Sequence, residues 1–147
     1  MEQILDLPVA EKRHLDYAGF GIRFVAVLID GILLQIVRAI LSYAMYGSYS
    51  FGANAGTELT VVSLVVGITY TVWMQSSSLQ GTLGKMAVGI KVGDAEGNRI
   101  SVGNAIGRYL ATFVSALILL IGYLMVIWDD KKQALHDKIA GTYVFKA

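Results

Sequence analysis

Residues 20–46 read FGIRFVAVLIDGILLQIVRAILSYAMY, an apolar run that only three charged side chains interrupt. The hydrocarbon core of a bilayer is about 30 Å thick, and an α-helix needs about 20 residues to cross it. The run is therefore long enough for a complete transmembrane helix. Its charged residues, Arg23, Asp30 and Arg38, are seven and eight positions apart, which places all three on one face of that helix.

The composition of the whole chain also favours a membrane protein. Of its 147 residues, 55% belong to the hydrophobic set and only 16% are charged, whereas soluble domains carry roughly 25% charged residues. So few charges cannot cover the large relative surface of a small soluble globule. The net charge of +1 argues against a nucleic-acid partner. The absence of cysteine excludes disulfides and cysteine-based metal sites.

Working outward from residues 20–46, the pattern predicts an all-α membrane protein with about three transmembrane helices, a small cytoplasmic β-hairpin and a C-terminal tail. The single transmembrane domain should span residues 20–145, after a cytoplasmic interfacial lead-in over residues 1–19. Its expected elements are helices at about 20–46, 58–75 and 104–128, a polar middle over 76–103 and a tail over 129–147. Within the polar middle, Ile90-Lys91-Val92 alternates like a strand, and Arg99-Ile100-Ser101 is the expected returning strand. Residues 141–145 are a further strand candidate.

The distribution of Lys and Arg predicts the orientation of the segments. Basic residues occur in the lead-in and in the polar middle but not in the loop over residues 47–57, so the first two should be cytoplasmic and the loop outside. The tail also carries four lysines, although three full crossings would place it outside. Residues 109–128 therefore either cross completely, which their apolar length favours slightly, or enter the membrane and return, breaking near Gly122.

Asp30 is the informative charge, because an Asp at the centre of a membrane helix costs roughly 2.5–3.5 kcal/mol on insertion scales. Arg23 and Arg38 lie about 10 and 12 Å away along the helix, too far for an intrahelical pair. A partner must come from elsewhere. The same depth falls near Thr69, Tyr70 and Thr71 on the second helix, and near Thr112 and Ser115 on the third. Asp30 is then either an ion or proton site or a contact that joins helices.

His136 and Asp137 form a second constellation. A metal site needs about three or four protein ligands, and the other histidine of the chain is His14, so we expect no metal and no cofactor. The alternative is that Asp137 or His136 fixes a short helix against the cytoplasmic hairpin. Arg108 and Lys85 are candidate partners for the carboxylates. The Gly81-Thr82-Leu83-Gly84-Lys85 segment lacks the spacing of a phosphate-binding loop.

Together these residues resemble the RDD family, which is named for an arginine and two aspartates. Arg23 and Asp30 match the first two in the frame that begins Ala18-Gly19-Phe20, and Asp137 matches the third within Leu135-His136-Asp137-Lys138. Gly81 to Lys85 and Arg108 also match, and the likeness covers about residues 17–145. The sequence departs from the family pattern at Gly21-Ile22 and at Glu96-Gly97.

The resemblance implies a multi-pass protein in the cell membrane of a bacterium or archaeon. It also implies transport, because some members of the family are described as sodium/proton antiporters. On that reading Asp30 titrates, Arg23 and Arg38 tune it, and Asp137, His136, Arg108 and Lys85 form a gate. The partners would be membrane lipids, a monovalent cation, a proton and further copies of the chain, since three helices cannot enclose a pathway. The alternative is a non-transporting assembly module with structural Arg and Asp residues. No nucleophile–base pair suggests an enzyme.

Overall fold

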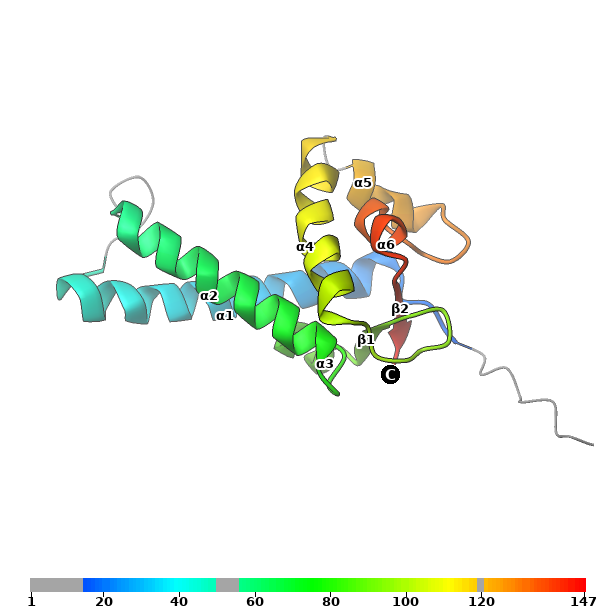
Figure 1. Ribbon diagram of the computed structural model, residues 1–147, viewed down its shortest axis with the longest axis horizontal. Coiled ribbons are helices and arrows are strands. Elements are labelled where there is room, and N and C mark those ends of the chain that lie inside the picture. Colours follow the sequence, from blue (N-terminus) through cyan, green and yellow to red (C-terminus); the bar gives the residue numbers. More distant parts are fainter. Residues whose placement is uncertain (1–14, 50–55, 119–120) are drawn as a thin grey trace, which may run out of the picture.

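The computed structural model describes residues 15–49, 56–118 and 121–147. Two long antiparallel helices, α1 (Phe20–Tyr46) and α2 (Thr57–Ser76), lie side by side and project away from the remaining elements (Figure 1). Gly47 ends α1 with a φ of 66°, and its N–H donates to the carbonyl of Tyr43. A left-handed residue of this kind is a common helix terminator, and glycine adopts it without a steric penalty. Both helices confirm the apolar segments expected from the sequence.

The polar middle contains a short helix, α3 (Leu83–Ala87), and a strand, β1 (Ile90–Gly93). The turn after β1 is held by Asp94, whose Oδ1 accepts hydrogen bonds from the N–H groups of Glu96 and Asn98 at 3.0 and 2.8 Å. Ser101 then caps the next helix, because its Oγ accepts from the Asn104 N–H at 3.1 Å.

The third apolar segment is bent. It contains α4 (Val102–Leu117), α5 (Ile121–Leu124) and a 3₁₀ helix, η2 (Met125–Ile127), and the two halves meet at 114°. Gly122 lies so close to α4 that a Cβ on it would be 2.9 Å from the Cβ of Ser115. The segment therefore folds back on itself, as the alternative with a break near Gly122 predicted, and the expected continuous helix over 104–128 is wrong.

The tail returns to the polar middle. It forms α6 (Leu135–Ala140), which packs on α4, and β2 (Tyr143–Lys146), which pairs antiparallel with β1. An isolated bridge joins Tyr17 to Phe145 on the other side of β2. The segment before α1, the polar middle and the tail thus meet near the first turns of α1, which is the arrangement that the lysines of the tail favoured.

The predicted hairpin has a different second strand. Residues 99–101 are not a strand, and the partner of β1 comes from the tail, in the segment that was the further strand candidate. Alternation shows that a strand is half-buried but does not identify its neighbour. Ile100 is instead buried in a small apolar core with seven other residues: Ala18, Ala26, Val72, Ile90, Val92, Ala105 and Val144.

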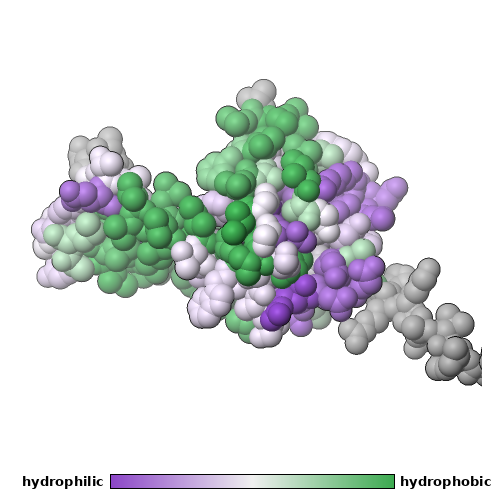
Figure 2. All heavy atoms as spheres, in the orientation of Figure 1, coloured by the Kyte–Doolittle hydropathy of each residue, from purple (hydrophilic) through white to green (hydrophobic). Residues whose placement is uncertain are grey.

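Hydrophobic and hydrophilic surfaces are separated in the molecule. Figure 2 shows apolar residues over much of the α1–α2 hairpin and the far end of α4, with hydrophilic residues gathered around the loop before α6 and near the strands. Within the described ranges, α1 and α2 are each long and apolar enough to cross a membrane, and α4 with α5–η2 adds a third span only if the bent pair is counted as one. The fold is therefore that of a helical membrane protein with a small two-stranded sheet.

Candidate functional site around Asp30 and Asp137

Asp137 lies at the centre of a buried charge cluster and has no solvent exposure. Its Oδ2 is 2.5 Å from Nη1 of Arg23 on α1, and its Oδ1 is 2.7 Å from Nη2 of Arg108 on α4. The same carboxylate accepts the Ala134 N–H at 3.0 Å, which caps the first turn of α6. One side chain of α6 thus joins three helices, so Asp137 holds this short helix against α1 and α4 rather than against the hairpin that was expected.

Arg23 adds further connections to the Asp137 cluster. Its Nε donates to the carbonyl of Ala18 at 2.9 Å, and its Nη2 donates to the carbonyl of Lys132. Arg23 therefore ties the segment before α1 to the loop before α6. The contact with Lys132 was not predictable from the residue pattern, because its acceptor is a backbone carbonyl that every residue carries.

The charges of the cluster decide the protonation of its acidic and basic members. Burial alone would raise the pKa of Asp137, but the positive charges of Arg108 and Arg23 together with the Ala134 N–H lower it to about 2. Burial lowers the pKa of the neighbouring His136 to about 3. Asp137 is therefore ionised and His136 neutral at pH 7. Nδ1 of His136 is 3.4 Å from Oγ of Ser115, and Nε2 is 3.4 Å from Oδ1 of Asp137.

Asp30 has a different environment, made of neutral donors. Its Oδ1 accepts from the Tyr70 hydroxyl and from the Gly84 N–H, each at 2.8 Å, and its Oδ2 accepts from the Thr82 hydroxyl at 2.5 Å. The Tyr70 oxygen in turn accepts the Leu83 N–H at 2.8 Å. Asp30 and Tyr70 together satisfy the free N–H groups at the start of α3 and hold it against α1 and α2.

Gly84 permits this close contact. A Cβ at this position would lie 2.2 Å from the carbonyl oxygen of Ala26 and 2.7 Å from Cγ of Asp30. The backbone of α3 therefore touches the backbone of α1, and no larger residue fits without moving one of them. Thr82 and Gly84 were missed as partners of Asp30. The available signal was a hydroxyl residue followed closely by a glycine, whose missing side chain permits a close backbone approach.

The predicted partners of Asp30 are partly confirmed. Tyr70 on α2 is a partner, as its depth suggested. The hydroxyls expected from the third segment are not, because Thr112 donates to the carbonyl of Tyr109 and Ser115 donates to the carbonyl of Ala111. Figure 1 shows α4 crossing the α1–α2 hairpin steeply, whereas the prediction assumed a third helix parallel to the other two.

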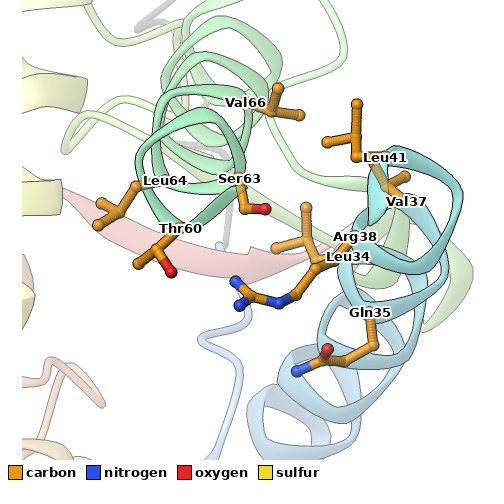
Figure 3. Close-up of a pocket in the computed structure, with 9 residues that line it drawn as sticks. All are labelled: Leu34, Gln35, Val37, Arg38, Leu41, Thr60, Ser63, Leu64 and Val66. Atoms are coloured by element: carbon orange, nitrogen blue, oxygen red, sulfur yellow. The ribbon is translucent and has the colours of Figure 1, made fainter. Parts of the chain in front are cut away.

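The arginines expected to tune Asp30 lie elsewhere. Arg23 is bound to Asp137, and Arg38 lines a groove between α1 and α2 nearer their loop end (Figure 3). The three charged residues do share one face of the α1 helix, as predicted. They are spread over about 22 Å of its length, however, so they do not form one site. Among the described residues, no group of three or more His, Cys, Asp or Glu side chains is arranged for a metal ion.

Lys85 lies on α3 in the electrostatic field of both clusters. Burial and the positive charge of Arg108 lower the pKa of Lys85 to about 7, while Asp30 and Asp137 act in the opposite direction. The amine therefore changes its charge near neutral pH, in contrast to the ionised Asp137 and the neutral His136.

Comparison with known proteins identifies the family. The model of the RDD family matches residues 17–141, nearly all of the chain. The chain belongs to the RDD family. In this RDD protein Arg23 and Asp137, which the sequence pattern matched to the family's arginine and second aspartate, are bound to each other across 114 residues, whereas Asp30 belongs to the separate neutral cluster.

Several curated relatives are similar over most of this chain. The uncharacterized protein YxaI of Bacillus subtilis is 34% identical over 145 residues, covering 86% of this chain and 95% of its own length. The uncharacterized membrane protein YteJ of the same organism is 28% identical, covering 87% of this chain and 80% of its own. The proline-rich antigen of Mycobacterium leprae is 37% identical over 88% of this chain, but over only 57% of that longer relative. No solved structure matches this RDD protein.

Proposed function

We propose that this RDD protein is a non-enzymatic assembly module of the cell membrane, in which the Arg and Asp residues hold the fold together. The observation that carries the proposal is the closure of the Asp137 cluster: a fully buried carboxylate is bound by arginines from α1 and α4. A buried carboxylate with two close guanidinium partners stays ionised, and these two positive charges oppose the binding of a transported cation. Asp30 is occupied in the same way by three neutral donors.

The α1–α2 hairpin supports the membrane part of this proposal. In the most apolar 18-residue stretch of α1 only 6% of the residues are buried inside the molecule, and in the corresponding stretch of α2 only 11% are. These faces would contact membrane lipids and, in a homo-oligomer, further copies of the chain. In the proline-rich antigen of Mycobacterium leprae the matching region makes up 57% of the protein. This relative supports the view that the domain can also be one part of a longer chain.

The orientation follows from the charges. The tail, the polar middle and residues 15–19 lie together, and the tail and the polar middle contain seven of the 12 Lys and Arg residues of the chain. The positive-inside rule then makes this end cytoplasmic and the α1–α2 loop external. With two crossings and a third segment that turns back, the lysines of the tail lie on the cytoplasmic side. The positive-inside rule is then satisfied by the tail as well as by the polar middle.

A second candidate function is exchange of a monovalent cation for a proton at Asp30. The observation that favours it is Lys85, whose amine titrates near neutral pH in the field of Asp30. In that scheme a protonated Lys85 would balance Asp30, and loss of its proton would leave the carboxylate free to bind a cation.

A flux measurement separates the two candidates. The purified chain is reconstituted in vesicles with a pH-sensitive dye inside, and NaCl or LiCl is added outside. We expect no cation-driven proton movement above that of empty vesicles, and more than one copy per particle by native mass spectrometry. Flux that disappears in folded Asp30→Asn and Lys85→Gln variants but persists in Arg99→Gln would overturn the module and support exchange. A single copy per particle would remove the homo-oligomer.

A further inference from the structure

A groove between α1 and α2 is separate from both aspartate clusters. It has a volume of about 280 Å³ and lies toward the loop end of the hairpin. Arg38 and Gln35 from α1 and Thr60 and Ser63 from α2 supply its polar groups, while leucines on both helices form its walls. Figure 3 shows the guanidinium group of Arg38 extending from α1 toward the side of α2 that carries Thr60 and Ser63.

Arg38 is a cation without a counter-ion in the part of the chain that the structure describes, where no hydrogen bond or ion pair is found for its guanidinium group. The hydroxyl protons of Ser63 and Thr60 are donated to the carbonyls of Leu59 and Gly56 at 2.6 and 3.3 Å. Residues 50–55 contain no acidic residue. A guanidinium group within an apolar span is costly unless an anion or water balances it.

The depth of Arg38 identifies where this anion comes from. Tyr43 and Tyr49, whose ring centroids are 5.5 Å apart, lie at the loop end, where tyrosines are typical of the membrane–water interface. Arg38 precedes Tyr43 by five residues, or about 7.5 Å of helix. A long arginine side chain extends over such a distance to keep its charge near the headgroups. A guanidinium group extended in this way would lie at the level of the lipid phosphates, with the leucine walls of the groove beside the acyl chains.

We propose that this groove binds an anionic phospholipid of the leaflet at the loop end, with Arg38 contacting the lipid phosphate and Leu41 and Leu64 contacting the acyl chain. The groove combines a free cation, an apolar wall and a position one to two helical turns inside the interface. A soluble anion would satisfy the cation but make no contact with the apolar wall, whereas a phospholipid provides both the anion and an acyl chain, so the lipid fits the groove better.

Lipid selectivity tests the proposal. The chain is reconstituted in phosphatidylcholine vesicles that contain a small fraction of spin-labelled phosphatidylglycerol or, in parallel, spin-labelled phosphatidylcholine. We expect phosphatidylglycerol to be preferred, and Arg38→Gln to lower this preference by about fivefold, the effect of one basic residue near an anionic lipid. The preference should be retained in Arg38→Lys, and the basic residues of the polar middle and the tail account for what remains in Arg38→Gln. Arg99→Gln is the matched control, since it removes the same charge from an exposed position in the polar middle.

A second measurement keeps the proposal testable if Arg38→Gln does not fold. Phosphatidylglycerol with a photoreactive headgroup should label peptides that contain residues 34–41 or 60–66 of the unmodified chain. Equal binding of both lipids, a preference that is unchanged in folded Arg38→Gln, or labelling confined to other peptides would overturn the proposal. A dimer that Arg38→Gln dissociates, without any lipid preference, would assign the groove to a second copy instead.

Discussion

Asp137 and Asp30 are both aspartates in polar clusters, but they meet opposite partners. Asp137 is fully buried and bound by the guanidinium groups of Arg23 and Arg108, whereas Asp30 is partly exposed and bound by two hydroxyls and one N–H. The charge of Asp137 is required because two buried cations depend on it. The charge of Asp30 only strengthens hydrogen bonds that a neutral acceptor can also make. Similar residue types therefore have unequal roles, and the comparison can be tested by removing each charge in turn.

The largest effect should follow Asp137→Asn. The variant leaves Arg23 and Arg108 in the interior without a counter-ion, which costs about 3–5 kcal/mol in comparable buried pairs. We expect a large fall in the thermal midpoint of the purified protein in detergent, and reduced abundance in membranes. Asp130→Asn is the control, because Asp130 is exposed on the loop before α6. Equal midpoints for the two variants would contradict the role of Asp137.

Gly84→Ala should cause the next largest loss of stability, because it disturbs packing rather than charge. The added Cβ would meet the Ala26 carbonyl at 2.2 Å, so α3 must move away from α1 and weaken the Asp30 contacts. Overpacking of this kind costs about 1–3 kcal/mol. Gly107→Ala is the matched control, since a Cβ there has no neighbour within 4 Å and alanine favours a helix. Denaturant midpoints that fall equally in both variants would show that the contact does not matter.

Acid should destabilise the Asp137 cluster through its neutral histidine. His136 has a folded pKa of about 3 against a usual 6.5, so the unfolded chain binds the proton first. The stability is complete above pH 6.5 and falls as the pH decreases toward 3, by at most about 1.4 kcal/mol per pH unit. Below pH 3.8, protonation of Asp137, whose folded pKa is about 2, adds a further loss.

The measurement for this prediction is the unfolding midpoint between pH 7 and pH 5. Two chains are compared, His14→Gln alone and His14→Gln with His136→Gln, so that the other histidine contributes to neither. The second chain should show a much weaker dependence on pH. Parallel curves for the two chains would mean that His136 accepts its proton in the folded state as readily as in the unfolded one.

Asp30→Asn should have the smallest effect. The Asn carbonyl can still accept from Tyr70 and Gly84, and the Thr82 hydroxyl can rotate to accept from the new amide. We expect a loss of about 1 kcal/mol, the usual net value of a hydrogen bond to an uncharged group. The measurement is the same thermal midpoint in detergent. A loss as large as that of Asp137→Asn would remove the contrast between the two clusters.

The helices were predictable from the sequence because long apolar runs depend little on tertiary context. α1 begins and ends where residues 20–46 indicated, and Gly47 supplies the stop signal. Tyr70 was also predictable as a partner of Asp30, since two antiparallel helices of known rise fix which residues share a depth.

The remaining contacts could not be predicted because they depend on one bend and on long-range pairing. The turn between α4 and α5 brings α6 against α4 and so delivers Asp137 to Arg108. A third helix parallel to α1 would have placed Ser115 near Asp30 instead. Similarly, β1 and β2 are separated by about fifty residues, and the alternation of β1 alone does not indicate a partner in the tail.

A double-mutant cycle between Arg108 and Asp137 tests most directly whether the charge cluster holds the helices together. The free energy of unfolding is measured in detergent for the unmodified chain, Asp137→Asn, Arg108→Gln and the double variant. We predict that the double variant loses less than the sum of the single losses, by about 1–3 kcal/mol, because it removes a buried cation together with its counter-ion. Losses that simply add would show that the two residues do not stabilise the fold through each other, and would contradict the structural role assigned to the pair.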